Sequence, residues 1–147
     1  MIHFQALGTF VMSNILAVLA CVIVYLIIGF VWYGPLFSKS WTTMNGIDIT
    51  TKKKEDMTKG MMHGMAMSVI TGFVITVVLG RGMQLLDMSS PTYPLIIATI
   101  LWLPFTALPF AQNYAYLQKP FKLLFIDAGY MLVSMWAISF ILYATVL

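Results

Sequence analysis

The chain has 147 residues, of which 61% are hydrophobic and only 9% are charged. An ordinary soluble domain is about 45–50% apolar and about 25% charged. This composition excludes a disordered chain, a nucleic-acid-binding domain and an ordinary soluble enzyme, because 8 basic and 5 acidic side chains cannot cover a soluble surface of this size. It predicts an integral membrane protein that forms a single transmembrane domain over residues 1–147.

The first apolar stretch predicts a membrane-spanning helix over about residues 14–34. No Asp, Glu, Lys or Arg occurs before Lys39, and about 20 helical residues cross the roughly 30 Å of bilayer hydrocarbon. Ser13 or Asn14 can cap the start of this helix, and the Gly-Pro pair at residues 34–35 predicts its end. The run is too long for the apolar core of a signal peptide, so we expect it to remain as a span.

The loop that follows, residues 35–59, is rich in lysine and long enough to hold structure of its own. The Asn-Gly pair at residues 45–46 predicts a turn. Thr50 or Thr51 could then cap a short helix over residues 52–59 that runs into the next span.

The second predicted span, about residues 60–80, carries a small residue at every fourth position. Residues four apart lie on one ridge of a helix, and small side chains there allow close approach of a second helix, in a right-handed crossing of about −40°. The partner could be another helix of this chain or a second subunit. Gly80 and Gly82, which flank Arg81, predict the end of the span. The ridge consists of Gly60, Gly64, Ser68, Gly72, Thr76 and Gly80.

The remaining two spans are predicted over about residues 93–114 and 123–146. Pro104 and Pro109 each remove a backbone hydrogen bond, so they predict a kink in the third span. The Lys-Pro pair at residues 119–120 separates the third span from the fourth. The predicted fold class is therefore all-α, an integral membrane bundle of four transmembrane helices.

The positive charges predict the orientation of this bundle. With four spans, loops 35–59 and 115–122 lie on one side of the membrane, and they carry seven of the eight basic residues. The loop over residues 81–92 carries only Arg81. By the positive-inside rule, the two lysine-bearing loops face the cytoplasm and both termini face outward, N-out and C-out. We expect the protein in the cytoplasmic (inner) membrane of a bacterium.

Asp127 is the only acidic residue inside a predicted span, about 6 Å along the axis from the start of that helix. Ionisable groups within a membrane are costly and usually face a partner or water. This candidate polar site could bind a proton, a cation or a lipid headgroup. The alternative interpretation is a structural clamp, or an aspartate that reaches interfacial water. The polar residues expected at the same level are His63, Gln112, Asn113 and Tyr33.

Methionines surround His63 in the second predicted span. Met61 and Met65 lie four residues apart, on one face of a helix, and thioethers are ligands suited to Cu(I). Met61, His63 and Met65 therefore form a candidate Cu(I) site, although methionine also fills irregular gaps between packed helices. Cys21, the single cysteine, is interpreted as a small buried apolar side chain.

We predict no catalytic residue and no cofactor, because the sequence lacks a P-loop, the HExxH and GxSxG motifs and a pair of intramembrane carboxylates. The leading hypothesis is a non-enzymatic multi-pass membrane protein that acts in helix-mediated assembly, membrane-protein interaction or lipid contact. Its expected partners are the lipid bilayer and either further copies of the chain or another membrane protein. The alternative is a small proton- or cation-coupled transporter or channel that uses Asp127 and His63, with Cu(I) bound through Met61 and Met65 as a variant. A membrane enzyme is the third hypothesis.

The segment after the first span is similar to the signature of an uncharacterised bacterial membrane family, domain of unknown function 1761. The resemblance covers nearly the whole chain and implies a four-span architecture, but it implies no reaction, substrate or site. It is carried by the WYGPLF segment at residues 32–37 with Lys39 and Trp41, by the Lys-rich loop, by the Gly/Met-rich entry to the second span, and by Trp102, Lys119-Pro120 and Asp127-x-Gly129-Tyr130.

Overall fold

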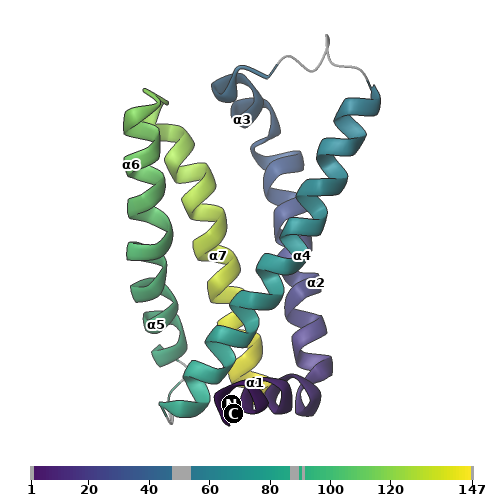
Figure 1. Cartoon of the computed structure of the whole chain (residues 1–147). Coiled ribbons are helices and arrows are strands. Elements are labelled where there is room, and N and C mark those ends of the chain that lie inside the picture. The colour runs from purple at the N-terminus through teal and green to yellow at the C-terminus, as the bar shows by residue number, and fades with distance from the viewer. Residues whose placement is uncertain (1, 48–53, 87–89, 91, 147) are drawn as a thin grey trace.

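The computed structural model describes residues 2–47, 54–86, 90 and 92–146 (Figure 1). Within these ranges every regular element is helical, and no strand occurs. The elements in chain order are α1 (Ile2–Ser13), α2 (Ile15–Val31), the π-helix η1 (Trp32–Leu36), α3 (Ser38–Asn45), α4 (Lys54–Leu85), α5 (Thr92–Trp102), the π-helix η2 (Leu103–Ala107), α6 (Leu108–Tyr116) and α7 (Phe121–Val146).

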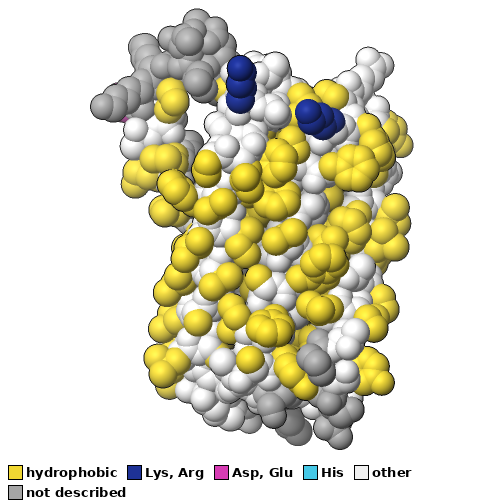
Figure 2. Space-filling view, turned by 180° about the vertical axis from the view of Figure 1, so that it is seen from behind, with side chains coloured by type: hydrophobic (Ala, Val, Ile, Leu, Met, Phe, Trp, Pro, Cys, Tyr) yellow, Lys and Arg dark blue, Asp and Glu magenta, His cyan; other side chains and the backbone are white. Residues whose placement is uncertain are grey.

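Four stretches of the described chain are long and apolar enough to cross a membrane. Large apolar side chains remain exposed along these stretches, and they cover most of the height of the face shown in Figure 2. A surface of this kind is suited to lipid rather than to water. The all-α bundle predicted from the sequence is therefore confirmed. The four stretches are Ile15–Leu36, Glu55–Leu85, Thr92–Tyr116 and Phe121–Val146.

Helix α7 lies at the centre of the bundle. It packs against α5 on one side and against α2 and α4 on the other (Figure 1). In its most apolar window 44% of the residues are buried, whereas the corresponding share is 17% in the first span and 22% in the second and third. Cys21, Ile138 and Leu142 are completely buried in this core, so the interpretation of Cys21 as a buried side chain is confirmed.

Helix α1 lies across the end of the bundle at which both ends of the chain are found (Figure 1). Phe10, only 3% exposed, fixes it there by packing over Gly80 of α4. Asn14 separates α1 from α2, but its side chain points back and donates from Nδ2 to the carbonyl of Phe10 at 2.9 Å. Asn14 is thus the N-cap residue of α2, one of the two positions predicted, but its side chain makes no capping hydrogen bond to that helix.

Helix α4 extends beyond both ends of the predicted span. Gly80 and Gly82 do not end it, because both stay in helical geometry; among the described glycines a positive φ is found at Gly46. The lysine-bearing segment from Lys54 onward forms the first turns of the same helix, as the sequence predicted. The proposed caps Thr50 and Thr51 lie outside the described residues.

Of the other three predicted breaks, two are confirmed and one is wrong. Gly46, with φ of 66°, ends α3 in the left-handed region, and residues 119–120 separate α6 from α7. The first span, however, does not end at residues 34–35. Pro35 lies inside η1, where the amide of Phe37 donates to the carbonyl of Trp32 five residues earlier. This wider turn accommodates the missing N–H of proline. In the third span, η2 contains Pro104 where a kink was predicted.

Candidate functional site: a buried aspartate clamp

The carboxyl group of Asp127 is the centre of a polar cluster between the spans. It lies in the second turn of α7 and is 8% exposed. Its Oδ1 accepts hydrogen bonds from the Tyr33 hydroxyl at 2.8 Å and from the Trp41 indole Nε1 at 3.0 Å. Its Oδ2 accepts a hydrogen bond from the Tyr114 hydroxyl. We call Asp127, Tyr33, Trp41 and Tyr114 the aspartate clamp.

Each donor of the aspartate clamp comes from a different helical segment. Tyr33 lies in η1, Trp41 in α3 and Tyr114 in α6, while the acceptor lies in α7. The rings of Tyr33 and Trp41 also meet edge to face, with centroids 5.6 Å apart. One carboxyl group therefore ties the first span, the helix that follows it, the third span and the fourth span together at one end of the bundle.

Two tryptophans fix the backbone of α7 on either side of the clamp. Trp32 donates from its indole Nε1 to the carbonyl of Ile126 at 2.9 Å, and Trp102 donates in the same way to the carbonyl of Ala128 at 2.7 Å. Gly129 lies beside the Trp32 ring, where a Cβ would make an ordinary contact at 3.4 Å. The Trp-Tyr-Gly-Pro and Asp-x-Gly-Tyr segments, far apart in sequence, thus form one packed unit.

A glycine allows a close approach of α2 and α7 one layer deeper. A Cβ on Gly29 would lie 3.1 Å from the hydroxyl of Tyr130, whose ring packs against those of Tyr25 and Tyr33 at centroid distances of 5.3 and 5.2 Å. A layer of packed aromatic rings therefore lies next to the clamp and fills the space between α2 and α7.

The carboxyl group of Asp127 has most of its hydrogen-bonding capacity occupied by the other residues of the clamp. A carboxylate offers about four lone-pair sites on its two oxygens, and three side-chain donors fill most of them here. In the described part of the chain the only ion pair joins Lys59 to Glu55, on the surface of α4. Asp127 is thus held by hydrogen bonds from neutral donors, an arrangement suited to joining helices.

Among the residues predicted to share this level, the structure brings only Tyr33 to Asp127. His63 is exposed on α4, where its Nδ1 lies 2.9 Å from the carbonyl of Lys59. Gln112 and Asn113 are exposed on α6. These side chains lie at similar depths on their helices, but they do not meet Asp127. On α6 it is Tyr114 that faces Asp127. Helix α4, which carries His63, diverges from α7 at this end (Figure 1).

Trp41 and Tyr114 are site residues that the sequence analysis did not include in the candidate polar site. Both side chains combine an aromatic ring with one O–H or N–H donor. This combination is typical of residues at the membrane interface, and it also allows them to donate to a buried carboxylate. A count of such donors near the single intramembrane acid would have pointed to them.

The candidate Cu(I) ligands are distributed over more than one face of α4. Met61 and Met65 are exposed one turn apart, whereas His63 is two residues from each of them, and residues two apart on a helix do not face one another. Within the described residues, no group of three or more His, Cys, Asp or Glu side chains could hold a metal ion.

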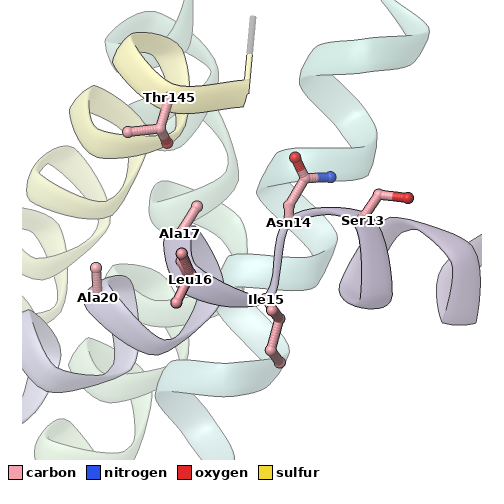
Figure 3. Close-up of a pocket in the computed structure, with 7 residues that line it drawn as sticks. All are labelled: Ser13, Asn14, Ile15, Leu16, Ala17, Ala20 and Thr145. Atoms are coloured by element: carbon pink, nitrogen blue, oxygen red, sulfur yellow. The ribbon is translucent and has the colours of Figure 1, made fainter.

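A surface hollow of about 400 Å³ lies at the bend between α1 and α2, near the C-terminal end of α7 (Figure 3). Two of its polar side chains already have backbone partners: the Asn14 side chain donates to the carbonyl of Phe10, and the Thr145 hydroxyl donates to the carbonyl of Ile141 at 2.7 Å. Ala17 and Ala20 leave the hollow open because they are small. We interpret it as a packing defect at a helix bend.

The fold and the clamp define a four-span helical membrane protein whose spans are tied at one end by a single aspartate. The model of a family described as a protein of unknown function (DUF1761) matches residues 16–143. The chain belongs to this family, as the resemblance in sequence implied. Comparison with curated proteins and with solved structures finds no match.

Proposed function

We propose that this protein is a non-enzymatic multi-pass membrane protein that acts through contacts of its helices, with further copies of the chain, with other membrane proteins or with lipid. The contact for which the geometry gives most support is self-assembly through residues 57–67 of α4, which we call the open stretch. The observation that carries this proposal is the different surroundings of the glycines along α4.

The small-residue ridge of α4 divides into two halves. In one half, a Cβ on Gly72 would lie 3.1 Å from the Tyr25 ring, and a Cβ on Gly80 would collide with the Phe10 ring. Thr76, between these two positions, is completely buried. In the other half, a Cβ on Gly60 or Gly64 would meet nothing within 4 Å. The described part of the chain therefore packs against only half of the ridge.

Glycine inside a helix is less favourable than alanine by roughly 1 kcal/mol. At Gly72 and Gly80 the close approach of an aromatic ring offsets this loss, but no described residue supplies such a contact at Gly60 and Gly64. A second copy that packs its own ridge against them would supply it, in the manner of small-xxx-small helix pairs.

The remaining surface of the open stretch is suited to the same role. Every residue from 57 to 67 is exposed, and the stretch points away from the other spans (Figure 1). Its large side chains are methionines, which adapt to an irregular partner surface. They are Met57, Met61, Met62, Met65 and Met67.

The arrangement around Asp127 gives less support to transport. A coupling group in a transporter faces water or a ligand path, whereas Asp127 is enclosed by three donors and His63 lies elsewhere. Hollows of about 400, 370 and 430 Å³ are lined by other residues. The proposal therefore assigns Asp127 to the clamp.

A pair of leucine substitutions tests the assembly proposal. Gly64→Leu places a large side chain on the open half of the ridge, and Ala66→Leu places the same side chain two residues away on another face of the exposed stretch. We expect the wild type and Ala66→Leu to behave as oligomers in native mass spectrometry and in cross-linking within bilayers. Gly64→Leu should be monomeric with unchanged helical content.

Two outcomes would contradict assembly through the ridge. One is a wild type that stays monomeric in bilayers at every protein-to-lipid ratio. The other is an identical distribution of oligomers in the wild type and in Gly64→Leu.

A further inference from the structure

A lateral groove of about 370 Å³ opens between α4, the third span and α7. Its lining is apolar except for Thr106 of the π-helix η2. The floor is buried, because Leu79, Met135 and Thr106 are 3%, 7% and 9% exposed, while the rim is open, with Val74, Val78 and Phe105 at 50%, 55% and 77%.

The groove lies within the membrane-spanning part of the bundle and ends close to a positive charge. Arg81 follows Val78 by three residues and Val74 by seven, so the three residues lie along one edge of α4. The rise of an α-helix places Arg81 about 4.5 Å beyond Val78 and about 10.5 Å beyond Val74. An extended ligand that lies along the rim from Val74 past Val78 therefore comes to the level of the Arg81 guanidinium.

The guanidinium of Arg81 is partly exposed and donates from one nitrogen to Oε1 of Gln84 at 2.7 Å. An arginine carries five N–H donors in a planar fork that fits a phosphate group. Arg81 is also the single basic residue in the chain between Lys59 and Lys119. It therefore provides an isolated anion-binding group at the headgroup end of an apolar groove.

We infer that the groove binds one acyl chain of an anionic phospholipid, whose phosphate is held by Arg81. This inference rests on the lipid-contact part of the proposed function and does not depend on self-assembly. A volume of about 370 Å³ lies in the range of about 300–1,000 Å³ typical of ligand sites. It also exceeds the roughly 150 Å³ of an apolar cavity that holds benzene.

The charge decides which lipid stays in the groove. Lipid tails are as apolar as the side chains of the groove, so moving a chain from the bilayer into it gains packing contacts and little hydrophobic free energy. Both kinds of lipid carry the phosphate, but the ammonium group of a zwitterionic headgroup offsets its charge, so Arg81 favours the lipid with a net negative charge. One basic residue near the surface corresponds to about a fivefold preference.

Native mass spectrometry of the detergent-purified protein tests this inference. The probes are phosphatidylglycerol and phosphatidylethanolamine with identical acyl chains, titrated separately and in competition. The wild type should retain one phosphatidylglycerol per chain, about fivefold more tightly than phosphatidylethanolamine. Arg81→Gln should bind both lipids equally weakly, and Val78→Trp, which fills the rim of the groove, should lose both. Lys39→Gln, at the opposite end of the bundle, is the matched control and should behave as the wild type.

The inference is overturned if Arg81→Gln keeps the preference for phosphatidylglycerol, or if Val78→Trp retains lipid as the wild type does. Circular dichroism and thermal unfolding check that both variants fold. Val78→Leu is a second variant at the rim, and it should keep lipid binding. The number of chains per particle is read from the same spectra. Absence of bound lipid from oligomeric wild type would contradict this inference alone. Lipid bound to a monomeric wild type would contradict the assembly proposal alone.

Discussion

Asp127 is stable within the bundle because three helical segments each supply one hydrogen-bond donor to it. A buried acceptor that loses its partners, or buried donors that lose their acceptor, cost about 1–3 kcal/mol per unsatisfied group in proteins. Hydrogen bonds within membranes average less, roughly 0.6 kcal/mol in double-mutant cycles. The clamp is therefore a moderate contribution to stability that is concentrated at one residue.

Substitution of Asp127 tests this role. Asp127→Ala leaves the Tyr33, Trp41 and Tyr114 donors without an acceptor, so we expect a loss of about 2–3 kcal/mol in the free energy of unfolding. Asp127→Asn keeps one acceptor oxygen, and its amide can donate to the Tyr114 hydroxyl, so a loss of about 1 kcal/mol is expected. The measurement is unfolding in mixed micelles.

Asp56→Asn, which changes an exposed acid at the start of α4, is the matched control and should leave stability unchanged. If Asp127→Ala were as stable as the wild type, Asp127 would not be a clamp.

At the scale of the element, the two halves of α4 have different surroundings. One half of its small-residue ridge packs against α1 and α2, through Gly80 and Gly72, and the other half is open at Gly60 and Gly64. The sequence pattern is the same in both halves, so only the path of the helix distinguishes a used glycine from an unused one.

Alanine substitutions should therefore have opposite effects in the two halves. Gly72→Ala forces a Cβ to within 3.1 Å of the Tyr25 ring, and overpacking of this kind outweighs the better helix propensity of alanine, so we expect a loss of about 1 kcal/mol. Gly64→Ala meets no contact within the chain and should raise the stability of the monomer by up to about 0.8 kcal/mol. Thermal unfolding under monomeric conditions measures both. Equal effects of the two substitutions would show that the ridge is not divided.

At the scale of the whole molecule, the lysine-bearing loops meet at one end. Lys39 and Lys122, from the first and third loops, line the same surface hollow, and the end with both chain termini is the opposite one (Figure 1). The positive-inside rule assigns the lysine end to the cytoplasm.

Reporter fusions test this orientation. Alkaline phosphatase, active only outside the cytoplasm, should be active when joined after Val146 and inactive when inserted after Ile47, in the first loop. Green fluorescent protein at the same two positions should give the reverse pattern. A fluorescent fusion after Val146 would invert the predicted orientation.

The parts of this structure that depend on local sequence could be predicted, and the parts that depend on the directions of side chains could not. Hydropathy and length identified four spans, and the lone acid in the fourth span identified the centre of the clamp together with Tyr33. His63 was misplaced because its depth along α4 says nothing about how far α4 diverges from α7. The continuation of the first span past residues 34–35 was missed because a π-turn provides a geometry for proline that the ordinary helix lacks.

The length of α4 has a consequence for the membrane around the protein. The 31 residues from Glu55 to Leu85 measure about 46 Å along the helix axis, against roughly 30 Å of bilayer hydrocarbon. Figure 1 shows a diagonal course of α4 relative to the other spans. We expect this tilt, and entry of the charged first turns into the headgroup layer, to accommodate the excess. A thicker bilayer favours a smaller tilt, which changes how far the outer half of α4 stands from the bundle. We therefore expect the thickness of the surrounding lipid to set the geometry of the surface that this helix offers to its neighbours.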